Sequence, residues 1–540
     1  MQIARYYHTL RYLKWSQIYW RLFYKVVKTV PDLSEPPNLR AKVSSWVKPI
    51  DKQKKLIGEQ SFNFLNETHE IFSESDWNNN SIEKLWLYNL HYFDDLCAVD
   101  AKIRYSSHAK LISRWIAENI PGYGNGWEPY PLSLRICNWI KWALSGNKLH
   151  HEWIHSLAIQ VRYLRNKLEW HLLGNHLFSN AKALVFAGLF FEGKEADSWL
   201  QKGLAILDLE ISEQVLEDGG NFELSTMYHA IFLEDLLDVI NVLRCYGYKI
   251  PPKLDTLIPL MFCWMKAMTH SDGEISFFND AAHGIAAKTN ELNRYVNRLS
   301  IHLDNNIVTD LVHLKSSGYV HAENNDALLI MDVAPIGPDY LPGHAHADTL
   351  SIEFSLFKNR IIVNSGTSCY GTSEERLRQR STSAHSTVEI NGENSSEVWG
   401  GFRVARRARP IGAKSWRTNS DIHISCAHDG YQRLVGKPIH QREVVLGDKS
   451  LVIVDRINGH YDTAVGRLYL HPLIIVELSD NPVSGKLKLP DGKMLMWQVK
   501  GCEAQIKKST YHPEFGKSIE NHYLELTFKQ NQSEVILSWN

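Results

Sequence analysis

Two histidines and an aspartate stand at alternate positions in the segment Gly343-His344-Ala345-His346-Ala347-Asp348. A Pro-Gly pair indicates a turn at its start, and the residues that follow alternate between apolar and polar, which is typical of a strand. Side chains two residues apart in an extended chain project to the same side, so His344, His346 and Asp348 are expected to share one face. The segment therefore predicts an imidazole-rich rim where a loop enters a sheet. A solvent-exposed pair of histidines on an edge strand is the alternative.

Two segments of the N-terminal half add further polar groups. Asn175 and His176 follow a glycine at a predicted helix start, and a Gly-Gly turn leads into a second helix whose first turns hold Glu223, Tyr228 and His229. Each also has a purely structural explanation, because Asn175 is a good helix cap and a packed tyrosine can bond its hydroxyl to backbone.

A basic stretch at residues 376–387 contains Arg380 and His385 and leads into a predicted strand; a solvated charged loop is the alternative. An amide, a tyrosine, a histidine and an arginine together suit the removal of a proton next to a carboxylate. The C5 proton of a uronic acid is weakly acidic while its carboxylate is charged, so a donor that neutralises the carboxylate stabilises the enolate. A free tyrosine has a pKa of about 10, so Tyr228 needs positive charge from His344 or Arg380 to act as a base near neutral pH.

Composition limits the classes of protein that remain. The 540 residues carry 59 basic and 60 acidic side chains, and this balance gives no indication of nucleic-acid binding. The seven cysteines include no C-x-x-C pair, which argues against a disulfide framework and a zinc knuckle. No apolar run approaches the about 20 residues of a membrane span. The 17 Trp, 23 Tyr and 19 Phe suit either sugar faces or the core.

The N-terminus has no apolar signal region, which predicts a cytoplasmic or membrane-peripheral protein. Residues 10–27 form a predicted basic amphipathic helix. Such a helix docks on its own protein or lies on an anionic membrane surface, and both interpretations stay open.

The elements that must position these groups fall into three parts. Residues 1–80 are expected to form a helical arm and a loop, and residues 81–315 show apolar residues three and four apart throughout, in helical hairpins that close into a toroid or form an open stack. Residues 316–540 show short strands with Gly, Asn and Asp turns, which predict an antiparallel β-sandwich. A cleft between the two large domains is the expected site.

Taken in order, these motifs resemble the heparinase II/III family of polysaccharide lyases, which is also similar to the PL15 and PL17 alginate lyases. The motifs that carry the resemblance are Gly126 to Arg135, Gly174-Asn175-His176, Asp218 to His229, Gly343 to Asp348, Asn364 to Thr367 and Arg380 to Val388.

The resemblance implies an (α/α) toroid followed by a β-sandwich, and β-elimination of a uronate-containing glycan, such as a glycosaminoglycan or an alginate-like polymer. The missing signal region, in contrast to exported degradative members, suggests a role in bacterial surface polysaccharide metabolism. It also implies that Asn175 and His176 neutralise the carboxylate, that Tyr228 is base and acid, and that His344 assists proton transfer. Substrate contacts are expected from Trp127, Tyr130, Arg135, Glu223, His229 and Arg380. For Trp127, Tyr130 and Arg135, a place in the core is the alternative. By family analogy the location is periplasmic.

No cofactor is expected to be required, but the resemblance implies a structural divalent metal, zinc or calcium, at His346, Asn364 and His385. Asn364 stands where the family has an acidic residue, and a neutral amide is a poorer ligand. Three other functions stay open: a uronyl C5-epimerase, a catalytically silent glycan-binding protein, and a glycoside hydrolase. The hydrolase requires two opposed carboxylates from among Glu128, Asp218 and Glu223.

Overall fold

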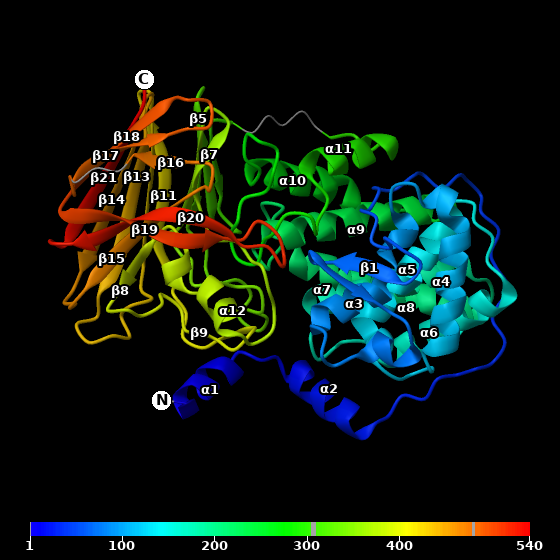
Figure 1. Cartoon of the computed structure of the whole chain (residues 1–540). Coiled ribbons are helices and arrows are strands. Elements are labelled where there is room, and N and C mark those ends of the chain that lie inside the picture. The colour runs from blue at the N-terminus through cyan, green and yellow to red at the C-terminus, as the bar shows by residue number, and fades with distance from the viewer. Residues whose placement is uncertain (1, 304–308, 478–480) are drawn as a thin grey trace.

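Helices and strands occupy separate halves of the chain (Figure 1). The computed structural model describes residues 2–303, 309–477 and 481–540. The helices of the N-terminal domain are α3 (Lys84–Tyr92), α4 (Tyr105–Glu118), α5 (Pro129–Leu144), α6 (His151–Asn166), α7 (Gly174–Phe190), α8 (Lys194–Gln214), α9 (Thr226–Cys245), α10 (Lys253–Ala267) and α11 (Thr289–Arg298). Across the described residues, no helix is both long and apolar enough to cross a membrane.

Burial separates inner from outer helices. Helix α7 is buried on almost every side and packs against α5, α8 and α9, whereas α4 buries only the stripe that includes His108, Leu111 and Trp115. A helix that is apolar all round needs neighbours on every side, while a striped helix has one solvated face. The helices therefore form the double-layered ring that the sequence predicts as a toroid.

The C-terminal domain contains two large antiparallel sheets that face each other. One sheet has the order β11 (Pro410–Thr418), β12 (Asp421–His428), β13 (Ile439–Leu446), β14 (Ser450–Asn458), β21 (Gln532–Ser538), β18 (Met494–Lys500), β17 (Ser484–Lys488) and β16 (Ile475–Glu477). The other has the order β19 (Cys502–Tyr511), β20 (Ile519–Phe528), β15 (Ala464–Leu470), β7 (Asn359–Val363), β6 (Ile352–Leu356), β5 (Ala327–Asp332), β4 (Tyr319–Glu323) and β3 (Leu311–Leu314), with β8 (Val388–Ile390) beside β15.

Burial along the strands shows which sheet meets the toroid. In β12 and β13 buried and partly exposed residues alternate, so one face is solvated, whereas β5 and β6 are buried at every position. Leu328 and Ile330 of β5 share an apolar cluster with Trp264 and Phe278 from the helical domain. The two domains are thus joined by a continuous core, and this core fixes the walls of any site between them.

The N-terminal arm, α1 (Gln2–Leu10) and α2 (Trp15–Val26), contacts both domains along one edge of the molecule (Figure 1). The Tyr24 hydroxyl on α2 donates to the Leu168 carbonyl at 2.6 Å. On α1, Thr9 Oγ1 accepts from Trp399 Nε1 at 3.1 Å, and Trp399 lies in the hairpin of β9 (Val398–Trp399) and β10 (Arg403–Val404). The remainder of the first 80 residues holds a second small hairpin, β1 (Ser61–Phe64) and β2 (Glu67–Glu70).

Two sequence predictions need local correction. Strand β3 already pairs with β4, so the sheet begins ahead of residue 316. The predicted strand through His344, His346 and Asp348 is wrong, because residues 343–350 form turns and irregular loop, and β6 begins only at Ile352. His344 and His346 nevertheless project toward one common partner, described below.

Candidate active site

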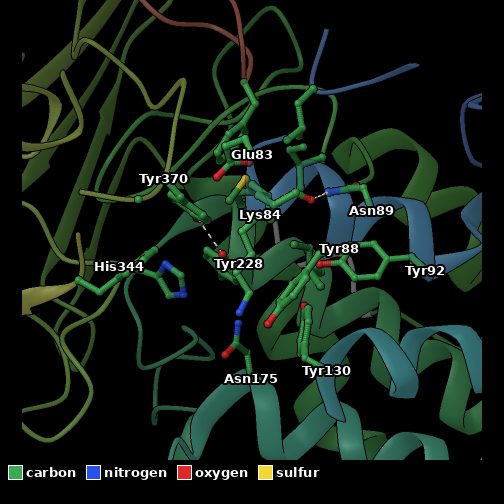
Figure 2. Close-up of a pocket in the computed structure, with 18 of the residues that line it drawn as sticks. Glu83, Lys84, Tyr88, Asn89, Tyr92, Tyr130, Asn175, Tyr228, His344 and Tyr370 are labelled. Carbon is green, nitrogen blue, oxygen red and sulfur yellow. Dashed lines mark hydrogen bonds between the residues drawn. The ribbon is translucent and has the colours of Figure 1, made fainter. Parts of the chain in front are cut away.

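A pocket of about 370 Å³ opens at the junction of the domains (Figure 2). Its size is in the range of ligand sites. The four residues predicted to act in catalysis, Asn175, His176, Tyr228 and His344, all line it. Aromatic rings supply much of the remaining wall, from Tyr88, Tyr92, Tyr130, Tyr370, Phe402 and Phe515.

Asn175 and His176 lie in the first turn of α7, as expected. Leu173 and Gly174 both have positive φ, and a Cβ on Gly174 would lie 2.3 Å from Leu341 Cδ2, so a side chain there is excluded. This tight entry aims the first turn at the pocket. Asn175 does not cap the helix, since the residue at the cap position is Leu173.

His176 is paired with a buried carboxylate. Its Nδ1 lies 3.0 Å from Glu169 Oε1, while Glu169 Oε2 accepts from Asn180 Nδ2 at 2.9 Å. Burial disfavours the imidazolium, but attraction to Glu169 outweighs it and raises the pKa of His176. The first turn of α7 therefore presents an amide and a cation-forming imidazole, together with the positive end of the helix dipole, to an anionic ligand.

Tyr228 lies in the first turn of α9 and is fixed at both ends. Ser225 Oγ caps the helix by accepting from the Tyr228 backbone N–H at 3.2 Å, and it donates to the Asp280 carbonyl at 2.5 Å. The Tyr228 hydroxyl is 2.8 Å from the hydroxyl of Tyr370. Burial raises the pKa of Tyr228 well above its usual value, so the resting group is a phenol.

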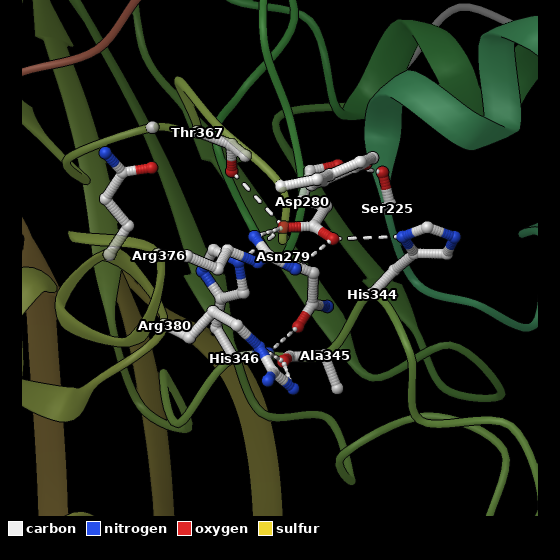
Figure 3. Close-up of polar contacts among 12 residues, drawn as sticks. Ser225, Asn279, Asp280, His344, Ala345, His346, Thr367, Arg376 and Arg380 are labelled. Carbon is white, nitrogen blue, oxygen red and sulfur yellow. Dashed lines mark hydrogen bonds and ion pairs between the residues drawn. The ribbon is translucent and has the colours of Figure 1, made fainter. Parts of the chain in front are cut away.

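His344 comes from the other domain and lies against Tyr228, with ring centroids 3.8 Å apart. Its Nδ1 is 2.9 Å from Asp280 Oδ2, which fixes Nδ1 as the donor and leaves Nε2 for the pocket (Figure 3). Glu223 Oε2 lies 3.6 Å from that Nε2.

Asp280 carries contacts on its other side too. His346 Nε2 lies 2.9 Å from its Oδ1, and the Arg376 guanidinium contacts both carboxylate oxygens, with Nη2 2.7 Å from Oδ2 (Figure 3). Burial would raise the pKa of Asp280, but Arg376 and the two histidines hold it well below its usual range. Asp280 is thus a permanent anion that orients His344.

The residues predicted to bind metal are only partly brought together. His346 Nδ1 lies 3.0 Å from His385 Nε2, and a carboxylate oxygen of Asp348 completes a buried group whose ligand atoms lie within 4.8 Å of one another. Asn364 as a ligand is wrong: its Nδ2 donates to the Phe277 carbonyl and its Oδ1 accepts from the Ser386 backbone N–H. Two imidazoles and one carboxylate are a donor set that suits zinc.

Two of the predicted sugar contacts on α5 and the loop before it are wrong. Trp127 is 2% exposed and packs between the rings of Trp115 and Tyr163. Arg135 is fully buried and donates to the carbonyls of His91 and Gly126. Only Tyr130 from this motif reaches the pocket.

His229 and Arg380 are also structural rather than substrate contacts. His229 is buried between the Met261 carbonyl and the Asn221 backbone N–H, and burial lowers its pKa to about 3. Arg380 is buried and donates to the Ala345 carbonyl at 2.9 Å, which shapes the loop that carries His344. Glu223 is buried and does not line this pocket, and burial raises its pKa.

Sequence reasoning missed Tyr370, Arg376 and Asp280. Arg376 was available in the basic stretch: it lies in α12 (Glu374–Gln379), and Arg380 follows that helix directly. Asp280 is the one acid in an otherwise apolar and neutral run at 275–282. An ionisable group in such surroundings indicates a candidate functional residue. Nothing in the local sequence singles out Tyr370.

The geometry suits one type of chemistry. An anionic group bound at the first turn of α7 would place its neighbouring carbon beside the Tyr228 hydroxyl and the His344 imidazole. A phenol and an imidazole can both transfer protons. His344 is held from outside the pocket by Asp280, and Tyr228 is held by Tyr370 within the pocket wall.

Two family models match consecutive parts of the chain. Heparinase II/III N-terminus matches residues 138–307, and Heparinase II/III-like, C-terminal matches residues 306–540. Together they extend from within α5 to the last residue.

Individual relatives agree with these matches. The chain is 25% identical to the heparin-sulfate lyase of Bacteroides stercoris, over 62% of this chain and 51% of that protein. It is 24% identical to the heparin-sulfate lyase of Pedobacter heparinus, over 64% and 53%. The chain spans about half the length of these relatives. In fold it resembles the crystal structure of heparinase III, with a TM-score of 0.68 and 17% identity over 88% of this chain and 79% of that one.

Proposed function

The chain belongs to the heparinase II/III family, and on that premise we propose that it is a polysaccharide lyase that cleaves a uronate-containing glycan by β-elimination. One observation carries the proposal: the Tyr228 and His344 rings, from different domains, are 3.8 Å apart in a pocket that Asn175 and His176 also line. A single uronate can contact all four groups there.

The first task is to neutralise the uronate carboxylate. The Asn175 amide donates to it, and His176, whose pKa is raised by Glu169, adds positive charge. Once the carboxylate charge is offset, the negative charge that develops after loss of the C5 proton is stabilised.

The second task is to move two protons. The C5–H bond breaks, its electron pair forms the C4=C5 double bond, and the C4–O4 bond breaks as O4 takes a proton. Tyr228 is the base and then the acid. Its hydroxyl proton first passes to His344, the phenolate oxygen receives the C5 proton and gives it to O4, and His344 then returns its proton to Tyr228. Because burial raises the pKa of Tyr228, the phenol suits the acid step. The base step requires help, and His344 stacked on the ring and Tyr370 bonded to the hydroxyl are placed to provide it.

We propose an acidic glycosaminoglycan as the substrate partner, because both curated relatives carry the name heparin-sulfate lyase. The test is incubation with heparan sulfate, chondroitin sulfate, alginate and polygalacturonate, while the ultraviolet absorbance of the unsaturated uronate is recorded. We expect absorbance to rise with at least one glycan. Tyr228→Phe should lower turnover by about 10²–10⁴-fold and leave glycan affinity nearly unchanged.

Three outcomes would contradict this proposal. Deuterium incorporation at C5 without unsaturation indicates an epimerase. Label from heavy-oxygen water at the new reducing end indicates a hydrolase. Binding without any turnover indicates a glycan-binding protein. The carboxylates favour elimination over hydrolysis, since Asp218 is bonded to the backbone of Ser316 and Ser317, and Glu128 to Tyr88.

We also propose that His346, Asp348 and His385 hold a structural zinc ion. The ion would crosslink the turns before β6 and the loop before β8. It would lie behind Asp280 and take no part in proton transfer, because these ligands do not line the catalytic pocket.

The outer face of the arm supports a membrane-peripheral location. Trp15, Tyr19, Leu22 and Val26 form one exposed stripe along α2, with Trp15 85% and Val26 82% exposed. Lys25 and Lys28 are exposed nearby, and no acidic residue occurs before Asp32. An apolar stripe beside basic residues fits an anionic bilayer surface.

Sedimentation with vesicles tests this location. We expect the protein to bind phosphatidylglycerol vesicles and not phosphatidylcholine vesicles, and Trp15→Ser/Val26→Ser to lose binding. If the double variant sedimented with phosphatidylglycerol vesicles as much as the parent protein does, the exposed stripe of α2 would not be the membrane-binding surface.

A further inference from the structure

A second cavity, of about 500 Å³, lies between the N-terminal arm and the two domains. Three segments form it: the inner face of α1 and α2, the loop that leads to His344, and the β9–β10 hairpin. We call it the arm pocket; the lining residues used below are Tyr6, Arg21, Asp339, Trp399, Phe402 and Arg403. The family models begin at residue 138, so they do not include the arm.

The arm pocket is positively charged. Among the described residues, neither Arg21 nor Arg403 has a carboxylate within ion-pair distance, although both line the same cavity. The acid in the wall, Asp339, is already bound by Arg407 and Arg409 at 2.6 and 2.8 Å. Burial and the charge of Arg403 both lower the pKa of Arg21, which agrees with two guanidinium groups that share a space without a counterion.

Aromatic rings stand beside these cations. The Trp399 ring lies 4.8 Å below the Arg403 guanidinium and 5.0 Å from the Tyr6 ring, edge to face. Thr9 fixes the indole by accepting its N–H. Flat rings pack against the faces of sugars, and guanidinium groups form paired hydrogen bonds with carboxylate and sulfate. The combination selects an acidic sugar.

The arm pocket adjoins the catalytic pocket. Phe402 lines both cavities, and the neighbours Gly343 and His344 line one each. Phe402 is 42% exposed at this boundary, 6.3 Å from the His344 ring, centroid to centroid. A glycan chain that places one uronate on Tyr228 and His344 can therefore extend past Phe402 into the arm pocket.

We propose that the arm pocket is a second binding site for the glycan, which takes an anionic sugar further along the same chain and grips it through Arg21, Arg403 and the Trp399 ring. This assignment rests on the proposed lyase function. It gives the arm a role in recognising long substrates, while the reacting groups stay in the catalytic pocket.

The test compares Arg21→Gln/Arg403→Gln with a matched control, Arg11→Gln/Arg294→Gln, which removes two exposed arginines that do not line the arm pocket. Probes are tetrasaccharide and decasaccharide fractions of heparan sulfate, chondroitin sulfate and alginate. For the decasaccharide that is cleaved, we expect the pocket variant to raise KM about ten- to a hundredfold with kcat within about twofold. KM for the tetrasaccharide and both constants of the control should stay unchanged.

Binding is measured separately by calorimetry in a Tyr228→Phe background, which keeps this test independent of turnover. Weaker decasaccharide binding in the pocket variant supports the second site even if no glycan is cleaved. Chemically desulfated fractions show whether sulfate or carboxylate is bound: if the pocket variant loses its effect the ligand is sulfate, and if it keeps the effect the ligand is carboxylate. Unchanged decasaccharide binding in a variant with a normal melting curve, or no binding of any decasaccharide by the parent protein, would overturn the proposal.

Discussion

His344 and His346 are two residues apart and contact opposite oxygens of the same carboxylate, yet their surroundings differ sharply (Figure 3). The side chain of His344 is 14% exposed and lies on Tyr228, whereas that of His346 is 1% exposed and faces His385. Burial lowers the pKa of His346 to about 4, so it stays neutral. One histidine faces the pocket and the other faces the core.

The difference shows that the carboxylate alone does not give an imidazole its role. Asp280 orients both rings, and its own charge is offset by the bidentate contact with Arg376. What distinguishes the two histidines is the free nitrogen: that of His344 reaches the pocket, and that of His346 reaches a buried cluster. Asp280 therefore joins a side that faces the pocket, where we propose catalysis, and a structural side, and substitutions can separate them.

The largest effect is expected from Asp280→Asn, which breaks both sides at once. An amide cannot balance Arg376, so a buried guanidinium loses its counterion, at a cost of about 3–5 kcal/mol in the free energy of unfolding. His344 also loses its acceptor, and turnover should fall by about 10²-fold or more. Urea unfolding and initial rates measure the two effects. If turnover falls while stability is retained, the carboxylate has no structural side.

The next largest effects are expected from His344→Ala and His346→Ala, one of which should mainly lower turnover and the other mainly lower stability. We expect His344→Ala to lower turnover by about 10²–10⁴-fold and to cost about 1 kcal/mol of stability, since one partly exposed hydrogen bond is lost. His346→Ala opens a hole in the buried cluster and should cost about 2–3 kcal/mol, with turnover reduced less than tenfold. If both variants lost turnover and stability to the same extent, the two histidines would not differ in role.

The sequence predicts the elements better than the directions of their side chains. Apolar residues three and four apart predict the toroid helices, and short strand-like runs between Gly, Asn and Asp turns predict the sandwich, because these patterns arise from burial along one element. Helix α5 shows the limit: its residues are buried on all sides, so periodicity cannot distinguish Tyr130, which reaches the pocket, from Arg135, which does not.

Long-range contacts account for the rest. Arg376 and Arg380 look equivalent in sequence, yet Arg376 reaches Asp280, 96 residues earlier, and Arg380 reaches a backbone carbonyl. Asn364 matches a family ligand position, but its amide is used by the backbone of Phe277 and Ser386. The partner that each of these side chains contacts depends on how the two domains pack, and local sequence spacing does not contain that information.

A smaller effect is expected at the second carboxylate–imidazole pair of the pocket, Glu169 and His176. Burial lowers the pKa of His176, but attraction to Glu169 outweighs burial and raises it. The contribution of the imidazolium to the free energy of unfolding is therefore fully present below pH 6.5, and it is lost as pH rises through the raised pKa. Activity should fall over the same alkaline range. Glu169→Gln lowers that pKa, so the alkaline limb of kcat/KM should move to lower pH. An unmoved limb would show that another group titrates.

The smallest effect on turnover is expected from removal of metal, because the zinc proposed at His346, Asp348 and His385 lies on the structural side of Asp280. A ligand that binds only the folded state stabilises it by about 2.7 kcal/mol when present at a hundred times its Kd. Dialysis against a chelator should therefore lower the melting temperature, and added zinc should restore it, while kcat at 25 °C stays unchanged. Asp348→Asn should abolish the response to zinc, whereas His344→Ala should keep it. If the chelator lowers kcat in proportion to the zinc removed, or if Asp348→Asn responds like the parent protein, the two sides of Asp280 are not separated as the geometry indicates.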